Sequence, residues 1–262
     1  ITNVTSDLFV EYFMRENHLK IEIETLSESV SILDLEKAEG FDRKCKSLKE
    51  SIQKSKSGII CEFKRKSPSN GNINYTSNIS DVIKGYEKAG AVGVSILTNK
   101  KYFDGSISDI NDVKTSIEIP ILRKEFVISE YQIIEAKSIG SDSILLIASI
   151  LSKEQIKNYS SLAKSLGLEV LLEIHSIDEL NEVSKYDIVQ IMTPSVLSRF
   201  HLSNPYKKII QGCKKVYLLS AGDDYEYWRK FREGSFISRS PHKDPLEIDL
   251  KKKDSPWENT RN

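Results

Sequence analysis

Ionisable side chains stand at the carboxyl ends of three short apolar segments. Lys64 and Glu173 each end such a segment, and Lys124 directly follows a third. Burial lowers the pKa of a lysine and raises that of a glutamate, whereas their mutual attraction opposes both shifts. Such a group can supply a general acid and a general base to one pocket. The same residues can equally form an ion-pair network that is only structural, and their types alone leave both alternatives open.

The segments that carry these residues belong to a regular alternation of β-rich and amphipathic stretches. Eight candidate strands begin 19 to 33 residues apart, at 59–64, 92–97, 119–123, 143–147, 168–173, 187–191, 215–220 and 235–238. Helices are predicted between them, notably at 80–90, 129–140, 153–167 and 176–185. Alternating strands and helices predict an α/β fold with a parallel sheet. Eight units in this length favour a closed (βα)8 TIM barrel over an open doubly wound sheet.

The chain is predicted to form one domain over residues 1–250. Residues 1–58 precede the first strand and contain helical candidates, notably 41–56, so an N-terminal helical extension is expected there. A partly disordered arm is the alternative for this segment. Residues 251–262 are rich in charge and are expected to be a solvated tail.

The alternation of side chains along a barrel strand predicts which residues face inward. In the first segment Glu62 and Lys64 share one face, whereas the opposite face is apolar and includes Cys61. Glu62 and Lys64 are therefore predicted to point into the barrel, and Cys61 to pack against the helices rather than act as a nucleophile. Lys124 and Glu173 are placed on the inward faces of their strands in the same way. Because the carboxyl ends of the strands carry the active site of such barrels, these side chains are expected to converge.

Four segments resemble, in order and at matching intervals, the motifs of the indole-3-glycerol phosphate synthase family. They are 61–71 (CEFKRKSPSNG), 95–106 with SILT and YFDGS, 120–136 with PILRKEF, YQ and EA, and 171–175 (LLEIH). The resemblance extends over residues 59–175. It implies a (βα)8 barrel that closes the pyrrole ring of 1-(2-carboxyphenylamino)-1-deoxyribulose 5-phosphate with loss of carbon dioxide and water, without a cofactor or metal.

The resemblance also implies roles for individual residues. Lys124 is the expected general acid and Glu173 the general base, while Lys64 engages the substrate carboxylate and Glu62 orients Lys64. The substrate-binding residues that the resemblance implies are Ser67 near the phosphate, Leu97, Phe103 and Phe126 around the aromatic ring, and Gly222 after the seventh strand.

The final third of the chain departs from the family motifs. MTP at 192–194 stands where the family has Asn-Asn-Arg, and LSAG at 219–222 stands for Ser-Glu-Ser-Gly, so that only Gly222 is kept. SRSP at 238–241 replaces Val-Gly-Glu-Ser. From residue type alone, Arg239 is a candidate substrate-binding residue that takes the phosphate in place of backbone amides, and hydrogen bonds from Ser220 and Ser240 are the alternative. Two alternatives to the synthase therefore stay open, a diverged paralogue with another substrate or much reduced activity and a non-enzymatic scaffold.

Composition and apolar patterning argue against several classes of partner, metal site and targeting segment. The 38 basic and 38 acidic residues cancel, which argues against nucleic acid or an anionic membrane as the main partner. Three scattered cysteines and four histidines predict neither disulfides nor a zinc site. No apolar run is long enough to span a bilayer, and residues 1–20 lack the apolar stretch of a signal peptide. We therefore expect a cytoplasmic protein, which we also take to be monomeric. The resemblance, not the composition, implies that it is a lyase (a decarboxylase of tryptophan and aromatic amino acid biosynthesis) that acts on a small phosphorylated molecule.

Overall fold

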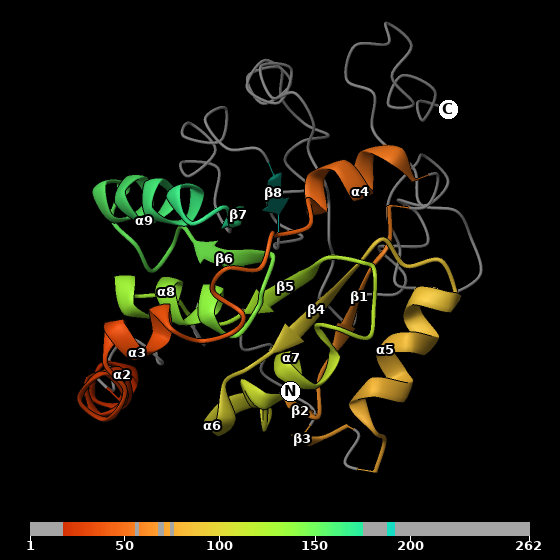
Figure 1. The fold of residues 1–262 in the computed structure, drawn as a ribbon, viewed down its shortest axis with the longest axis horizontal. Coiled ribbons are helices and arrows are strands. Elements are labelled where there is room, and N and C mark those ends of the chain that lie inside the picture. The colour runs from red at the N-terminus through yellow and green to blue at the C-terminus, as the bar shows by residue number, and fades with distance from the viewer. Residues whose placement is uncertain (1–17, 56–57, 68–70, 74–75, 175–187, 192–262) are drawn as a thin grey trace, which may run out of the picture.

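A single parallel sheet organises the computed structural model, which describes residues 18–55, 58–67, 71–73, 76–174 and 188–191 (Figure 1). Its strands, in spatial and chain order, are β1 (Ile60–Phe63), β4 (Gly93–Leu97), β5 (Ile121–Lys124), β6 (Ser143–Ile147), β7 (Glu169–Ile174) and β8 (Ile188–Ile191). A separate antiparallel pair joins β2 (Lys66–Ser67) to β3 (Gly71–Asn72). Six predicted strands are thus confirmed, with bounds that differ by at most two residues. The predicted strands at 215–220 and 235–238, the helix at 176–185 and the tail lie outside the described residues.

Helices connect the strands. They are α5 (Ile79–Lys88), α6 (Lys100–Phe103), α7 (Ser108–Val113), α8 (Glu130–Ser138) and α9 (Lys153–Ser165). Ser129 and Ser152 begin α8 and α9 with capping boxes, in which the serine side chain and a glutamine three residues later satisfy exposed amides. Gly140 and Gly167 follow these helices with positive φ angles of 89° and 78°. Only glycine adopts this conformation without steric cost, so the helices end close to where the sequence predicts.

The two faces of the sheet carry different side chains, as the alternation predicts. Phe63, Val94, Ile96 and Ile121 pack in one apolar cluster with residues of α5 and α7. Residues of the opposite parity form a second cluster that includes Leu122, Leu145, Ile147 and Leu171. Because Glu62, Lys124 and Glu173 have the parity of this second set, they lie on the face away from α5 and α7. The predicted inward face is confirmed for the described strands.

Three helices precede the sheet, namely α2 (His18–Ser29), α3 (Ile32–Glu36) and α4 (Leu48–Lys54). Figure 1 shows α2 and α3 beside α8, and the Tyr131 hydroxyl donates to the Val30 carbonyl at 3.1 Å. The α4 helix lies at the amino end of β4, where Ser51 Oγ donates to the Val92 carbonyl at 2.6 Å. The expected helical extension is present in its described part, residues 18–54.

The prediction of a helix over 41–56 is wrong in its first half, because α4 begins only at Leu48. The segment before it is bound to the sheet instead. Asp142 accepts hydrogen bonds from Arg43 Nη2 at 2.5 Å, from the Lys46 amide at 2.7 Å and from the Ile121 amide at 2.8 Å. These tertiary contacts replace the local hydrogen bonds of a helix and fix the extension to the amino ends of the strands.

Replacing Asp142 by Asn should lower the free energy of unfolding. The carboxylate is 1% exposed and accepts three hydrogen bonds, one of them from a guanidinium. Loss of its charge should cost about 2 kcal/mol, as is typical of hydrogen bonds to charged groups. Urea unfolding measures the change. The matched control is Glu50→Gln in the exposed pair with Lys54, which should leave the midpoint unchanged. Equal midpoints for Asp142→Asn and the unaltered protein would contradict this account.

Candidate active site

Glu62 bridges two lysines at the carboxyl ends of the strands. Lys64 Nζ donates to Glu62 Oε1 at 2.8 Å, and Lys124 Nζ donates to Glu62 Oε2 at 3.2 Å. The side chain of Lys64 is 22% exposed, that of Lys124 18% and that of Glu62 16%, so all three are shielded but still reach solvent. Each carboxylate oxygen binds one ammonium, which holds the two positive charges side by side without direct contact.

The sheet register explains how Glu62 reaches both lysines. β4 lies between β1 and β5, and its inward residue Ser95 is paired with Glu62 on one side and with Leu122 on the other. Lys124 lies one inward position beyond Leu122. The small side chain of Ser95 leaves room for the diagonal ion pair across β4.

Glu173 contributes a second carboxylate at the same end of the sheet. It is the inward residue that follows Leu171 on β7, two strands from β5, and it is only 5% exposed. Its backbone carbonyl accepts a hydrogen bond from the Ala148 amide at 2.9 Å, which ties the end of β7 to the turn after β6. The strand ends therefore present a buried acid on the same face as the Glu62 ion pairs.

Three aromatic side chains form a cluster, and one of them is close to Lys124 in the chain. Phe126, two residues beyond Lys124, stacks on Phe103 of α6 with ring centroids 6.1 Å apart and an interplanar angle of 21°. Tyr102 meets Phe126 edge to face at 6.3 Å. Leu97 ends β4, is buried and is paired in register with Lys124. Phe103 and Phe126 therefore lie together, and Leu97 lies beside Lys124. The sequence analysis did not single out Tyr102.

The loop after β1 is fixed by an ion pair that the sequence analysis also missed. Arg65 donates to both carboxylate oxygens of Asp109, at 2.6 and 2.7 Å, and Asp109 is buried. The Ser106 amide donates to the same carboxylate at 3.1 Å.

Ser67, the predicted phosphate contact, is buried on β2 directly after this anchored segment. The other predicted contacts in the last two loops, Gly222 and Arg239, lie outside the described residues.

Cys61 has the environment of a packing residue. It lies on the helix-facing side of β1, and burial raises the pKa of its thiol, which disfavours the nucleophilic thiolate.

In the part of the chain that the structure describes, no group of three or more His, Cys, Asp and Glu side chains is arranged to hold a metal ion. Among the same residues no helix has the length and apolarity to cross a membrane.

Comparison with known proteins identifies the same family as the motifs. Residues 15–190 match the family model described as indole-3-glycerol phosphate synthase. Proteins of that name are 41% identical over 173 residues in Bacteroides thetaiotaomicron, 45% over 133 in Leptospira interrogans and 37% over 205 in Petrotoga mobilis. These alignments cover 66%, 51% and 78% of this chain, respectively. They span 66%, 53% and 76% of the relatives, so the chain matches only about half to three quarters of their length.

A double-mutant cycle should detect the interaction between Glu62 and Lys124. Glu62→Gln removes the charge that both ammonium groups contact, and Lys124→Met removes one of those groups with little change in volume. We expect a coupling free energy of about 1 kcal/mol in urea unfolding, as is common for residues in direct contact. The coupling should shrink at high salt, because these side chains are partly exposed. The same cycle at the exposed pair of Glu50 and Lys54 is the control and should show a smaller coupling, about 0.5 kcal/mol at most. Additive effects at Glu62 and Lys124 would contradict the observed geometry.

Proposed function

The chain belongs to the indole-3-glycerol phosphate synthase family, and from this we propose that it catalyses the reaction for which that family is named. The substrate is 1-(2-carboxyphenylamino)-1-deoxyribulose 5-phosphate, and the products are indole-3-glycerol phosphate, carbon dioxide and water. We assign the protein to the carboxy-lyases of tryptophan biosynthesis. Its partner is a small phosphorylated molecule. We place it in the cytoplasm, a location supported by the free thiols of Cys45 and Cys61.

The observation that carries the proposal is the pair of lysines held by one carboxylate. In the ring closure, the ring carbon that bears the carboxylate attacks the ribulose carbonyl carbon. The carbonyl oxygen gains negative charge and takes a proton from Lys124. Lys64 binds the substrate carboxylate before reaction and holds it until the carbon–carbon bond breaks and carbon dioxide leaves with the electron pair returned to the ring. Preorganised ammonium groups stabilise such charges in the transition state better than water does.

Glu173 and the aromatic residues fit the remaining steps. After decarboxylation a hydroxyl group leaves as water and a proton is removed from the intermediate, which requires an acid and a base. Glu173 is assigned as the base, and Lys64 donates the proton to the leaving hydroxyl. The stacked rings of Phe103 and Phe126, together with Leu97, supply the apolar surface that an anthranilate ring contacts. Glu62 keeps the two ammonium groups in the places that these roles require.

Phosphate binding is assigned to residues of the β2–β3 pair and of the final loops. Ser67 is assigned to the phosphate from the β2–β3 pair, and Arg239 and Gly222 from the final loops. The family match ends at residue 190, two residues before the first departure from the family motifs at Met192. The acid–base residues all lie within the matched part. The turnover test therefore also decides whether the protein is a diverged paralogue that acts on another substrate.

Purified protein should convert the phosphorylated substrate to indole-3-glycerol phosphate, which is followed by the fluorescence of the indole product. Lys124→Ala should reduce kcat by about a hundredfold or more, because it removes a general acid. Lys54→Ala, which removes an exposed lysine of α4 at the other end of the strands, is the control and should leave kcat unchanged. Activity that Lys124→Ala does not affect would reject the assignment of Lys124. Absence of turnover in the unaltered protein would favour the diverged paralogue.

Glu173→Gln should lower kcat by about a hundredfold or more while changing KM little, because the amide keeps the size but not the basicity of the carboxylate. Glu169→Gln is a closely matched control on the same face of β7. Glu169 binds Ser47 Oγ and the Lys49 amide at the amino end of the strand, far from the proposed reaction. Its substitution should lower the melting temperature without lowering kcat. Equal kcat losses in both variants would show that Glu173 acts only through stability.

A further inference from the structure

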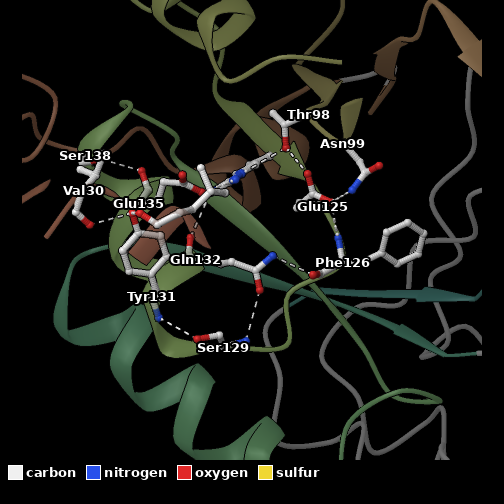
Figure 2. A network of polar contacts seen from close by, with 12 residues as sticks. Val30, Thr98, Asn99, Glu125, Phe126, Ser129, Tyr131, Gln132, Glu135 and Ser138 are labelled. Atoms are coloured by element: carbon white, nitrogen blue, oxygen red, sulfur yellow. Dashed lines mark hydrogen bonds and ion pairs between the residues drawn. The ribbon is translucent and has the colours of Figure 1, made fainter. Parts of the chain in front are cut away.

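Glu125 is a buried carboxylate that joins the carboxyl ends of β4 and β5 (Figure 2). Its Oε2 accepts a hydrogen bond from Thr98 Oγ1 at 2.7 Å, and its Oε1 accepts from Asn99 Nδ2 at 3.2 Å and from the Phe126 amide at 3.0 Å. Glu125 is 7% exposed and follows Lys124 directly, so its side chain leaves the strand on the opposite face. None of the roles assigned above uses this residue.

A buried arginine extends the network toward α8. Arg123 Nε donates to Thr98 Oγ1 at 3.2 Å, Nη1 donates to the Gln132 carbonyl at 3.1 Å and Nη2 donates to Glu135 Oε2 at 2.5 Å. The Thr98 hydroxyl therefore links the guanidinium of Arg123 to the carboxylate of Glu125. Lys124 is thus flanked on both sides by residues whose side chains are anchored behind the sheet.

The network clamps the backbone of Phe126 on both sides. The amide of Phe126 donates to Glu125, and its carbonyl accepts from Gln132 Nε2 at 2.9 Å. Gln132 Oε1 in turn accepts from the amides of Ile128 and Ser129 at 2.8 and 3.2 Å. Figure 2 shows these contacts around the start of α8, with the Phe126 ring directed away from them. The backbone that carries the aromatic ring is consequently held by side chains outside the site.

Asn99 transmits the same constraint to α6. While its Nδ2 donates to Glu125, its Oδ1 accepts from the Tyr102 amide at 3.1 Å and begins the helix. A four-residue helix has little stability of its own, so this cap matters for its orientation. The cap orients the helix that presents Phe103 to Phe126. One carboxylate therefore constrains both partners of the aromatic stack as well as the strand end that presents Lys124.

We propose that Glu125 is a positioning residue that fixes the Lys124 ammonium against Glu62 and the Phe126 ring against Phe103. It touches neither the substrate nor the reacting atoms. The expected effect on kcat rests on the proposed function, whereas the positioning itself is a property of the structure. Burial raises the pKa of the Glu125 carboxyl, with Arg123 opposing the shift, so keeping this acid behind the sheet is costly and is offset by its three hydrogen bonds.

The kinetic test compares Glu125→Ala with Glu125→Gln at a temperature at which both are folded by circular dichroism. Glu125→Ala releases the three donors and should lower kcat by about tenfold to a hundredfold, the scale of a displacement of about 1 Å. In Glu125→Gln an amide oxygen still accepts from Asn99 and Phe126, so most of the activity should return. The control is Glu87→Ala, because Glu87 similarly accepts from two backbone amides, at Glu118 and Ile119, ahead of the amino end of β5. It should lower stability without lowering kcat.

Crystal structures of the unaltered protein and the variants provide a readout that does not need the proposed function. Glu125→Ala should lengthen the 3.2 Å contact between Lys124 and Glu62 and separate the rings of Phe103 and Phe126, whereas Glu125→Gln should keep both. If Glu125→Ala does not fold, Thr98→Val removes one donor with little change in shape and should cause a smaller loss of kcat. Unchanged kcat and geometry in the altered proteins, or equal kcat losses in Glu125→Ala and Glu87→Ala, would overturn the proposal. If the unaltered protein has no turnover, the proposed function fails, and the structures alone decide the positioning.

Discussion

The site depends on one carboxylate that binds two ammonium groups. Two lysines placed together at the end of a sheet repel each other, and without a shared anion their side chains would turn toward solvent. Glu62 removes this repulsion and fixes each nitrogen at hydrogen-bond distance from its own oxygen. The ion pair also depends on the sheet register. Glu62 meets Lys124 diagonally across β4, where the inward residue between them is the small Ser95. The chemistry and the packing of β1, β4 and β5 are therefore parts of one arrangement.

The opposite ends of the strands serve a different purpose. There the polar side chains Asp142 and Glu169 bind the segment that leads into α4, and the apolar side of α4 covers the sheet through Leu48 and Ile52. These contacts stabilise the fold and lie at the end of the sheet opposite the groups that we assign to the reaction. The division is characteristic of (βα)8 barrels, the fold of the family to which this chain belongs, of which the described residues supply six parallel strands. Substitutions at the two ends of one strand, such as Glu169 and Glu173 on β7, can therefore distinguish effects on stability from effects on the proposed activity.

The inward face was predictable because Glu62 and Lys64 alternate with apolar residues along the first strand, and burying charged side chains against the helices is costly unless they find partners there. The same reasoning fails for Arg123 and Glu125, which do face the helices and are charged. Their partners, Glu135, Thr98 and Asn99, come from other elements, so nothing in the local pattern shows that these charges are satisfied. The one local signal was that Lys124 has a charged residue on each side, Arg123 and Glu125, whose side chains must leave the strand on the opposite face.

Local patterns also mispredicted the segment before α4. Residues 41–47 have a composition compatible with helix, but Arg43 and Lys46 bind Asp142 almost a hundred residues away, and this tertiary contact outweighs weak helix propensity. The expected roles of Gly222 and Arg239 come from motifs in a part of the chain that the structure does not describe. Among the described residues, the charged groups of the proposed site lie on β1, β5 and β7 or, for Lys64, directly after β1.

The most direct test of the central claim is a crystal structure of the full chain with an unreactive analogue in which the ribulose carbonyl is reduced to an alcohol. The account predicts that the aromatic carboxylate lies within hydrogen-bond distance of Lys64 Nζ and the alcohol oxygen within that distance of Lys124 Nζ, with Glu62 still contacting both lysines. An analogue bound away from these two nitrogens, or lysines that leave Glu62 and point apart from the ligand, would contradict it.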